Sequence, residues 1–236
     1  MNKEEMKIAL SAAVSDIKGI RSSAIEIQTA IERIIHEQNA TDIEQPRDGV
    51  WYKGYNLSPL LDEIAEGEGT SDKTANEKLL DSGYDVPFAY GVYHFPERPL
   101  TKHTLDEIRV FQTEQITATK GKITGTKYGT SAVGRYQIMR RTLDGLRKLM
   151  HAPEFQLFDK EFQDRCAVEL LKDCWLDKWL NGSLSNKGFH TKLANIWRSI
   201  ENPVNGYAEY DFEQPVGTTA DELYAAFDAV RASHAA

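Results

Sequence analysis

Apolar residues near the start of the chain recur at alternating spacings of three and four, the repeat of a coiled-coil seam. The repeat is formed by Leu10, Ala13, Ile17, Ile20, Ala24, Ile27, Ile31 and Ile34. A seam sustained over about three heptads predicts one long amphipathic helix within residues 1–38. Its apolar stripe needs a partner, so we expect self-association through residues 10–34 or packing on the chain's own globular domain. Attachment to a larger assembly is the third alternative.

The helical repeat is lost in residues 39–50, where turn-forming residues gather. This stretch contains Asn39, Asp42, Pro46, Asp48 and Gly49, and such a cluster between periodic segments is typical of a linker. We therefore expect a linker over 39–50 and one domain over 51–236, a length close to the usual single-domain range of about 100–200 residues.

The sequence of this domain contains several signals for the starts of helices. Ser58-Pro59 predicts an N-cap followed by proline at the first helical position. The stretches "TLDE" at 104–107 and "TADE" at 219–222 match the capping box. Leu143 and Leu146 mark a helix between Met139 and Met150. A further helix is predicted from Asp159 to Leu180, with a buried face of Phe162, Cys166, Leu170 and Cys174.

Residues 116–132 interrupt this helical pattern. The stretch "ITATKGKITGTKYGTSA" is rich in threonine and glycine, which favours a short hairpin over a helix. The sequence therefore predicts the α+β class, mainly α: a helical domain with a small β-hairpin lobe, preceded by the N-terminal helix.

Composition limits the partners of the chain. With 41 % hydrophobic and 27 % charged residues it has the balance of a soluble globular protein, and it contains no run of about 18 apolar residues that would span a membrane. A net charge of −8 argues against duplex nucleic acid. The six histidines show no metal-ligand spacing, so no metal and no cofactor is expected. Cys166 and Cys174 are separated by about 12 Å of helical rise, and we expect both to be reduced.

Glu68 in "IAEGEGT" is the strongest candidate for chemistry. If a helix begins at Ser58, Glu68 shares a face with Leu61 and Ile64. Apolar surroundings and the negative end of the helix dipole would both raise the pKa of its carboxyl, as suits a proton donor at neutral pH. Gly67 and Gly69 would let a bulky ligand approach the backbone. The alternative is a solvated residue at a glycine helix cap.

A second candidate stretch, "SAVGRYQIM", occupies residues 131–139. It follows the predicted hairpin and leads into a helix, so Gly134 to Gln137 are expected at the junction of two lobes, where clefts form. Gln137 offers an amide to sugar hydroxyl or acetamido groups, and Tyr136 offers a stacking face. The alternative is an ordinary helix start with one aromatic residue.

Four stretches taken in order resemble one known family. "LLDEIAEGEGT", "GYDVPFAYG", "SAVGRYQIM" and "ANIWRSIENPVNGY" are similar to elements of the bacteriophage lambda endolysin family of lytic transglycosylases, which has a two-lobed lysozyme-like fold. The resemblance runs from about Ser58 to the C-terminus and leaves residues 1 to about 50 outside. It implies that Glu68 is the catalytic acid and base. The candidate substrate-binding residues are Gly69, Thr70, Asp85, Gly134, Tyr136, Gln137 and Tyr207.

The resemblance implies peptidoglycan as substrate, cut at the β-1,4 bond between N-acetylmuramic acid and N-acetylglucosamine. In that family the 6-hydroxyl of the sugar attacks and leaves a 1,6-anhydro end. A hydrolytic muramidase would instead need a second carboxylate, for which Asp85 is the best candidate; its alternative role is a loop carboxylate bonded to backbone amides. A non-catalytic module of a phage tail is the other alternative.

The segment between Gly91 and Thr130 looks longer than its equivalent in the family, so one rim of the saccharide cleft is expected to differ. No export signal is evident near the N-terminus. We therefore expect synthesis in the cytoplasm and action on the cell wall, reached through a membrane lesion, a virion or a dedicated secretion system.

Overall fold

The computed structural model describes residues 48–123, 127–206 and 216–234. The chain divides into two compact units, Met1–Lys53 and Gly54–Ala236, and every residue discussed below as part of the site belongs to the second. The N-terminal helix predicted within residues 1–38, with its proposed association surface, lies outside the described residues, as does most of the predicted linker.

Helices dominate the described part of the chain. The α-helices are α2 (Ser58–Gly67), α3 (Asp72–Glu77), α4 (Leu105–Thr119), α5 (Arg140–Leu149), α6 (Lys160–Asp173), α7 (Leu176–Leu180), α8 (Asn186–Ile196) and α9 (Ala220–Ser233). Three 3₁₀ turns, η1 (Gly83–Asp85), η2 (Phe88–Gly91) and η3 (Leu100–Lys102), connect α3 to α4. The α+β, mainly α class is confirmed, because a two-stranded sheet of β1 (Trp51–Tyr52) and β2 (Tyr55–Asn56) accompanies the helices.

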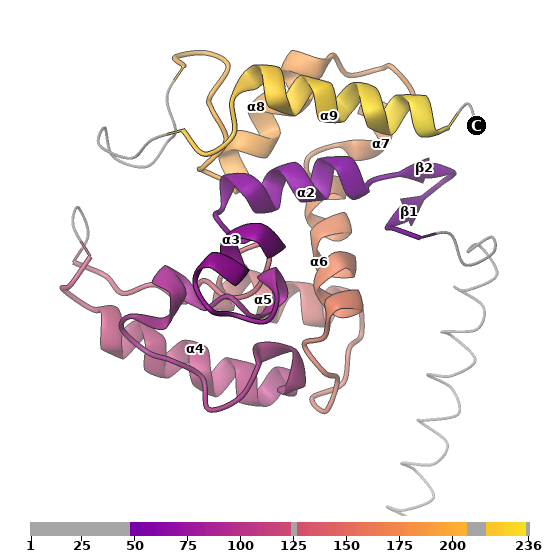
Figure 1. Cartoon of the computed structure of the whole chain (residues 1–236). Coiled ribbons are helices and arrows are strands. Elements are labelled where there is room, and N and C mark those ends of the chain that lie inside the picture. The colour runs from indigo at the N-terminus through magenta and orange to yellow at the C-terminus, as the bar shows by residue number, and fades with distance from the viewer. Residues whose placement is uncertain (1–47, 124–126, 207–215, 235–236) are drawn as a thin grey trace, which may run out of the picture. The chain divides into compact units, whose positions relative to one another are not determined.

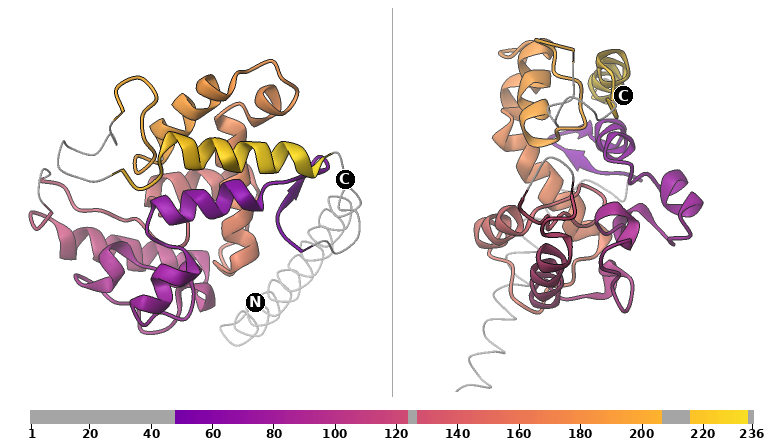
Figure 2. Two further views of the ribbon diagram at one scale, coloured as in Figure 1. Left: turned by 45° about the horizontal axis from the view of Figure 1, so that its top comes forward. Right: turned by 90° about the vertical axis from the view of Figure 1, so that its left-hand side faces the viewer.

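Helix α2 packs along α9, and the two lie side by side in Figures 1 and 2. The apolar face of α2 buries Leu60, Leu61 and Ile64, and α9 buries Leu223 and Phe227. Figure 1 shows α6 running from the neighbourhood of α5 to α7. Beyond it, aromatic rings join α7, α8 and α9. Trp179 stacks on Phe189 with centroids 4.6 Å apart, and it packs tilted against Phe227 with centroids 4.9 Å apart.

The helix starts are set largely by the predicted caps. Thr104 and Thr219 each form a full capping box, with Glu107 and Glu222 returning the second hydrogen bond, so both predictions are confirmed. Asp159 caps α6 through the amide of Phe162. At α2 the boundary differs by one residue, because Leu57 is the N-cap and Ser58 is the first helical residue.

The prediction of one continuous helix from Asp159 to Leu180 is wrong, because this stretch forms two helices, α6 and α7. Trp175 adopts a left-handed conformation with φ +67°, which ends α6 and lets α7 turn so that Trp179 enters the aromatic cluster. The predicted buried face is confirmed, and both Cys166 and Cys174 are buried free thiols. Burial raises the pKa of Cys174 to about 12, which keeps the thiol protonated and unreactive.

The predicted hairpin at 116–132 is also wrong. Residues 116–119 are the last turn of α4, and the described residues of this stretch contain no strand. The two strands in the described part of the chain lie at 51–56. Threonine is tolerated in this helix because its hydroxyl donates to the carbonyl four residues earlier, as Thr117 does to Thr113 and Thr119 does to Gln115.

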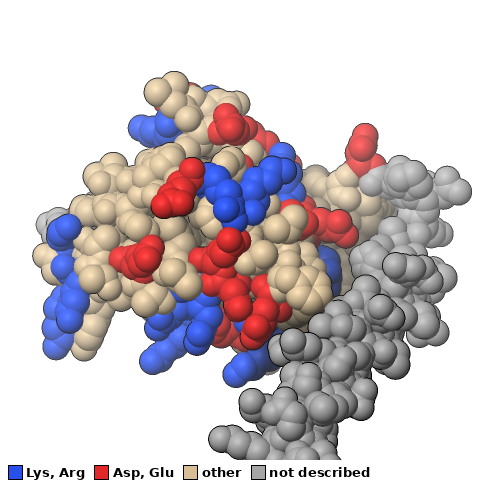
Figure 3. All heavy atoms as spheres, turned by 90° about the horizontal axis from the view of Figure 1, so that it is seen from below, with Lys and Arg blue, Asp and Glu red and all other residues tan. Residues whose placement is uncertain are grey.

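Charges are mixed on the face of the molecule shown in Figure 3, where acidic and basic side chains alternate and neither sign forms a broad field. Several ion pairs of the described residues link α4, α5 and their neighbouring loops: Arg98 with Glu107, Arg109 with Asp144, and Arg147 with both Asp106 and Glu154. Exposed pairs of this kind contribute at most about 1 kcal/mol each to stability.

Candidate active site

Glu68 occupies the C-cap position of α2. Its backbone amide donates to the carbonyl of Ile64 at 3.0 Å, so the residue continues the helical turn. The residue as a whole is partly exposed. The buried residues Leu61, Ile64 and Ala65 form the face that the sequence assigned to it. Glu68 is therefore held at the end of a helix whose inner side is apolar.

The carboxyl of Glu68 meets Ser199, which lies 131 positions later in the chain. The Ser199 hydroxyl donates to Oε1 of Glu68 at 2.6 Å, and the Ser199 backbone amide adds a second favourable contact. Burial raises the pKa of Glu68, while the two Ser199 contacts pull it back part of the way. The group is thus protonated more readily than a solvated glutamate, but its ionised form is not left without donors.

Ser199 is fixed by its own backbone partners. Its backbone carbonyl accepts hydrogen bonds from the amides of Gly217 and Thr218 at 2.9 and 3.3 Å. The backbone amide of Glu201 donates to the carbonyl of Thr218 at 2.9 Å. A parallel bridge between Ile200 and Thr218 completes this pairing. The segments 199–201 and 217–218 together hold Ser199 against the end of α2.

Gly67 has a structural role that differs from the one expected. A Cβ at this position would lie 2.3 Å from Oγ1 of Thr218, and a Cβ at Gly217 would lie 2.2 Å from the carbonyl oxygen of Gly67. The missing side chain therefore admits the chain's own 217–218 segment. The expectation that Gly67 opens space for a ligand is corrected.

Gly69 ends the turn after Glu68 with φ +67°, a conformation that costs other residues energy. The hydroxyl of Tyr90 donates to its carbonyl at 2.9 Å, and a Cβ on Gly69 would lie 2.8 Å from that hydroxyl oxygen. Thr70 follows as a buried residue whose hydroxyl contacts the carbonyls of Ala65 and Arg135. Thr70 thus joins the end of α2 to the "GRYQ" stretch and is not open to a ligand.

The "GRYQ" stretch forms a tight turn. Val133 and Ile138 pair across it in an antiparallel bridge, and Gln137 donates from its backbone to Gly134 at 3.1 Å. The Gly134 amide donates to the carbonyl of Val86 at 2.9 Å, so this turn lies against the "GYDV" stretch. Gly134 has φ +74° and leaves room for the side-chain amide of Gln163.

Tyr136 and Gln137 differ in exposure. Tyr136 is 2 % exposed and donates its hydroxyl to Asp164 at 2.6 Å, so the expectation that its ring offers a stacking face is corrected: both the ring and the hydroxyl are already used inside the fold. Gln137 is partly exposed, and its Nε2 donates to the carbonyls of Val86 and Gly134. These two bonds fix the orientation of the amide.

Asp85 is 8 % exposed, and its Oδ1 accepts the backbone amide of Thr101 at 2.8 Å. This matches the alternative that the sequence left open for it, a loop carboxylate bonded to a backbone amide. The bond ties η1 to η3.

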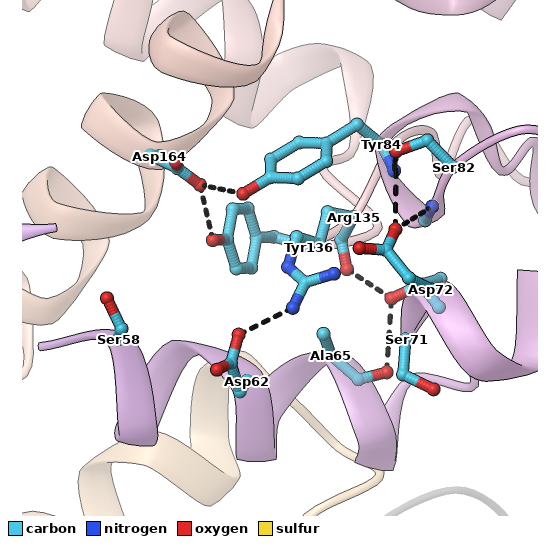
Figure 4. Close-up of polar contacts among 12 residues, drawn as sticks. Ser58, Asp62, Ala65, Ser71, Asp72, Ser82, Tyr84, Arg135, Tyr136 and Asp164 are labelled. Atoms are coloured by element: carbon cyan, nitrogen blue, oxygen red, sulfur yellow. Dashed lines mark hydrogen bonds and ion pairs between the residues drawn. The ribbon is translucent and has the colours of Figure 1, made fainter. Parts of the chain in front are cut away.

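A buried charge connects these stretches, as Figure 4 shows. The Arg135 side chain is 7 % exposed and lies with its guanidinium carbon 5.0 Å from the centre of the Tyr84 ring, while Nη2 donates to Asp62 at 2.7 Å. Asp164 accepts from both Tyr84 and Tyr136. Burial raises the pKa of Asp164, against the effect of the two tyrosine hydroxyls.

The four sequence stretches therefore converge in space, but their members differ in role. Glu68 and Gln137 remain partly exposed, whereas Thr70, Asp85 and Tyr136 are buried supports. Tyr207 lies outside the described residues. Sequence reasoning missed Ser199 and Tyr90; both lie within quoted stretches, but spacing alone does not pair them with the end of α2.

A family model described as Endolysin matches residues 58–230, which covers most of the chain and includes every described residue of the site. No curated protein and no solved structure matches the chain significantly.

Proposed function

The chain belongs to the endolysin family, and on that basis we propose that it is a lytic transglycosylase with Glu68 as its acid and base. Endolysins are phage-encoded enzymes that degrade the bacterial cell wall, so the substrate of this chain is peptidoglycan. The proposed bond is the β-1,4 linkage from N-acetylmuramic acid to N-acetylglucosamine, and the proposed product carries a 1,6-anhydro end. A lysozyme-like arrangement of the helices is part of the same proposal.

The observation that carries the proposal is the environment of Glu68. Its pKa is raised by burial, yet two donors from Ser199 are available to the ionised form. A group of this kind first donates a proton to the bridging oxygen and then accepts one from the attacking hydroxyl. Gly69 and the amide of Gln137 are the proposed substrate contacts among the described residues, and Tyr207 remains a proposed contact from the resemblance.

The competing mechanism is hydrolysis with Asp85 as second carboxylate. The bond from Thr101 to Asp85 and the burial of Asp85 favour a structural role instead. Asp85→Asn separates the catalytic role of Asp85 from the structural one. The side-chain oxygen of asparagine can accept the same hydrogen bond from the Thr101 amide, but asparagine has no carboxylate. We expect the variant to keep most of its activity, with exposed Asp81→Asn as the matched control. Loss of turnover in a folded Asp85→Asn protein would favour hydrolysis.

The deciding experiment is mass spectrometry of muropeptides released from purified peptidoglycan. Anhydro ends are expected, and products heavier by one water would overturn the transglycosylase assignment. Glu68→Gln should abolish release while exposed Glu66→Gln, on the same helix, leaves it intact. Release by Glu68→Gln at the wild-type rate would reject Glu68 as the acid.

A further inference from the structure

We propose that Ser199 is the residue that stabilises Glu68 in its ionised stage and sets the orientation of its carboxyl. This inference rests on the proposed function of Glu68 and assigns a positioning role to a residue that the family resemblance did not single out. Ser199 acts through Glu68 and not on the sugar directly.

The geometry that supports this role is a short, directed contact on a rigid support. The Ser199 hydroxyl donates to Oε1 of Glu68 at 2.6 Å, within the range of hydrogen bonds to a charged oxygen. Its backbone is held by Gly217 and Thr218, and it lies between Trp197 and Ile200, both buried. A donor whose position is fixed before reaction spends little energy on reorganisation when charge develops.

The segments that carry Glu68 and Ser199 are also bonded to the "GRYQ" turn. The indole Nε1 of Trp197 donates to the carbonyl of Tyr136 at 3.3 Å, and Thr70, two positions after Glu68, contacts the carbonyl of Arg135. The two segments that bring Glu68 and Ser199 together are thus both tied to the same turn. The distance between hydroxyl and carboxyl is set by the fold and not by two free side chains.

The chemical step shows where the hydroxyl is needed. Glu68 gives its proton to the bridging oxygen as the bond from the muramyl C1 to that oxygen breaks. The resulting carboxylate then takes the proton of the muramyl 6-hydroxyl as O6 bonds to C1, which returns Glu68 to its acid form. No proton is consumed overall. Between the two transfers Glu68 is an anion in a partly apolar site, and the Ser199 hydroxyl and amide are its donors.

Other charges near this region do not substitute for Ser199. The titratable or charged groups on the elements around Glu68 are Asp62, Glu63 and Glu66 on α2, Tyr90 on η2, Arg198 and Glu201 beside Ser199, and Asp221, Glu222, Tyr224, Asp228 and Arg231 on α9. Among the described residues, burial and the two Ser199 contacts account for the shift in the pKa of Glu68.

The first test measures the contact without catalysis. Carboxyl NMR titration of Glu68 in the full chain should give a higher pKa in Ser199→Ala than in the wild type, because a donor to the ionised form is lost. Ser199→Thr keeps a hydroxyl and should restore the wild-type value. Ser183→Ala, an exposed serine before α8, is the control. An unchanged pKa in Ser199→Ala would overturn the proposal.

The second test measures turnover on purified peptidoglycan. Ser199→Ala should lower kcat by about 10- to 100-fold, the effect of one hydrogen bond to a charged group, with KM nearly unchanged. The alkaline limb of its pH profile should move upward with the pKa of Glu68, and Ser199→Thr should recover both features. A loss confined to KM, or wild-type turnover in a folded Ser199→Ala protein, would refute the role.

The two tests also separate this inference from the proposed function. If the wild type releases no anhydro product, or Glu68→Gln stays active, the proposed function fails whatever Ser199 does. If Glu68→Gln is inactive and Ser199→Ala is not impaired, the proposed function stands and the inference about Ser199 is wrong.

Discussion

The hydroxyl of Tyr90 donates a 2.9 Å hydrogen bond to the carbonyl oxygen of Gly69, the residue directly after Glu68. Tyr90 reaches this position from a strained turn, since it and Ala89 both adopt left-handed conformations with φ +55° and +50°. Such conformations cost roughly 1–2 kcal/mol each in residues other than glycine. The ring packs against the buried residues Ala75, Leu80 and Val86, which offsets part of this cost and holds η2 over the end of α2.

We expect Tyr90→Phe to weaken turnover because the carbonyl of Gly69 loses its donor while the ring remains. A loss of several-fold in kcat is the expected size for one neutral hydrogen bond of about 1 kcal/mol. Tyr93→Phe is the matched control, since the ring of Tyr93 stacks on Phe88. Kinetics on purified peptidoglycan decide the matter: equal turnover in the two variants would mean that the Tyr90 hydroxyl does not position the Glu68 turn.

The close approach of Gly67 to Thr218 predicts strong energetic coupling between these positions. Gly67→Ala places a methyl group 2.3 Å from the Thr218 hydroxyl oxygen and should lower the free energy of unfolding by about 1–3 kcal/mol through overpacking. In a Thr218→Ala background that atom is absent, so the same substitution should cost less. A double-mutant cycle by urea unfolding measures this coupling; additive effects would contradict the contact.

The raised pKa of Glu68 predicts a pH dependence of stability. Because the folded state binds the Glu68 proton more tightly than the unfolded state, this group's contribution to stability falls as pH rises from 4.5, the ordinary pKa of the side chain, through the folded pKa. Each unit of the raised pKa corresponds to about 1.4 kcal/mol. Glu68→Gln should therefore be more stable than the wild type at pH 8, with the gap closing near pH 4.

Urea unfolding across this pH range checks the prediction, and Glu66→Gln is the control, because Glu66 is exposed on the same helix. A Glu68→Gln protein that is less stable than the wild type at pH 8 would show that the ionised carboxylate is well accommodated in the fold.

Local signals in the sequence were sufficient for several elements. The capping boxes at Thr104 and Thr219 depend on residues three positions apart, and the buried face of α6 depends on helical periodicity. The hairpin prediction failed because threonine and glycine content does not reveal that buried Gln112 and Gln115 of α4 donate to carbonyls of residues 131, 132 and 138. These bonds join parts of the chain that composition cannot relate.

The residues of the candidate site also differ in whether local sequence or distant contacts determine their environment. Glu68 is proposed as the acid from its own helix face, which is a local property. Tyr136 was misjudged because its burial depends on Asp164, a residue on α6. Ser199 was missed because its partner lies 131 positions away. The proposal for Glu68 therefore depends on residues of one helix, whereas the contacts of Tyr136 and Ser199 required the tertiary structure.

The pair formed by Arg135 and Asp62 differs from the surface pairs because its two side chains are unequally buried, at 7 % and 67 % exposure. Asp62→Ala leaves the buried guanidinium without its closest acceptor, although Asp72 and Asp164 still interact with its charge. We expect a loss of about 1–3 kcal/mol in the free energy of unfolding, the cost of an unsatisfied buried donor. Asp144→Ala breaks the exposed pair with Arg109 and should cost at most about 1 kcal/mol. Urea unfolding at low and high salt distinguishes the two variants, because salt should remove the effect of Asp144→Ala but not that of Asp62→Ala. Equal losses of unfolding free energy in the two variants would mean that the burial of Arg135 adds nothing to its pair with Asp62.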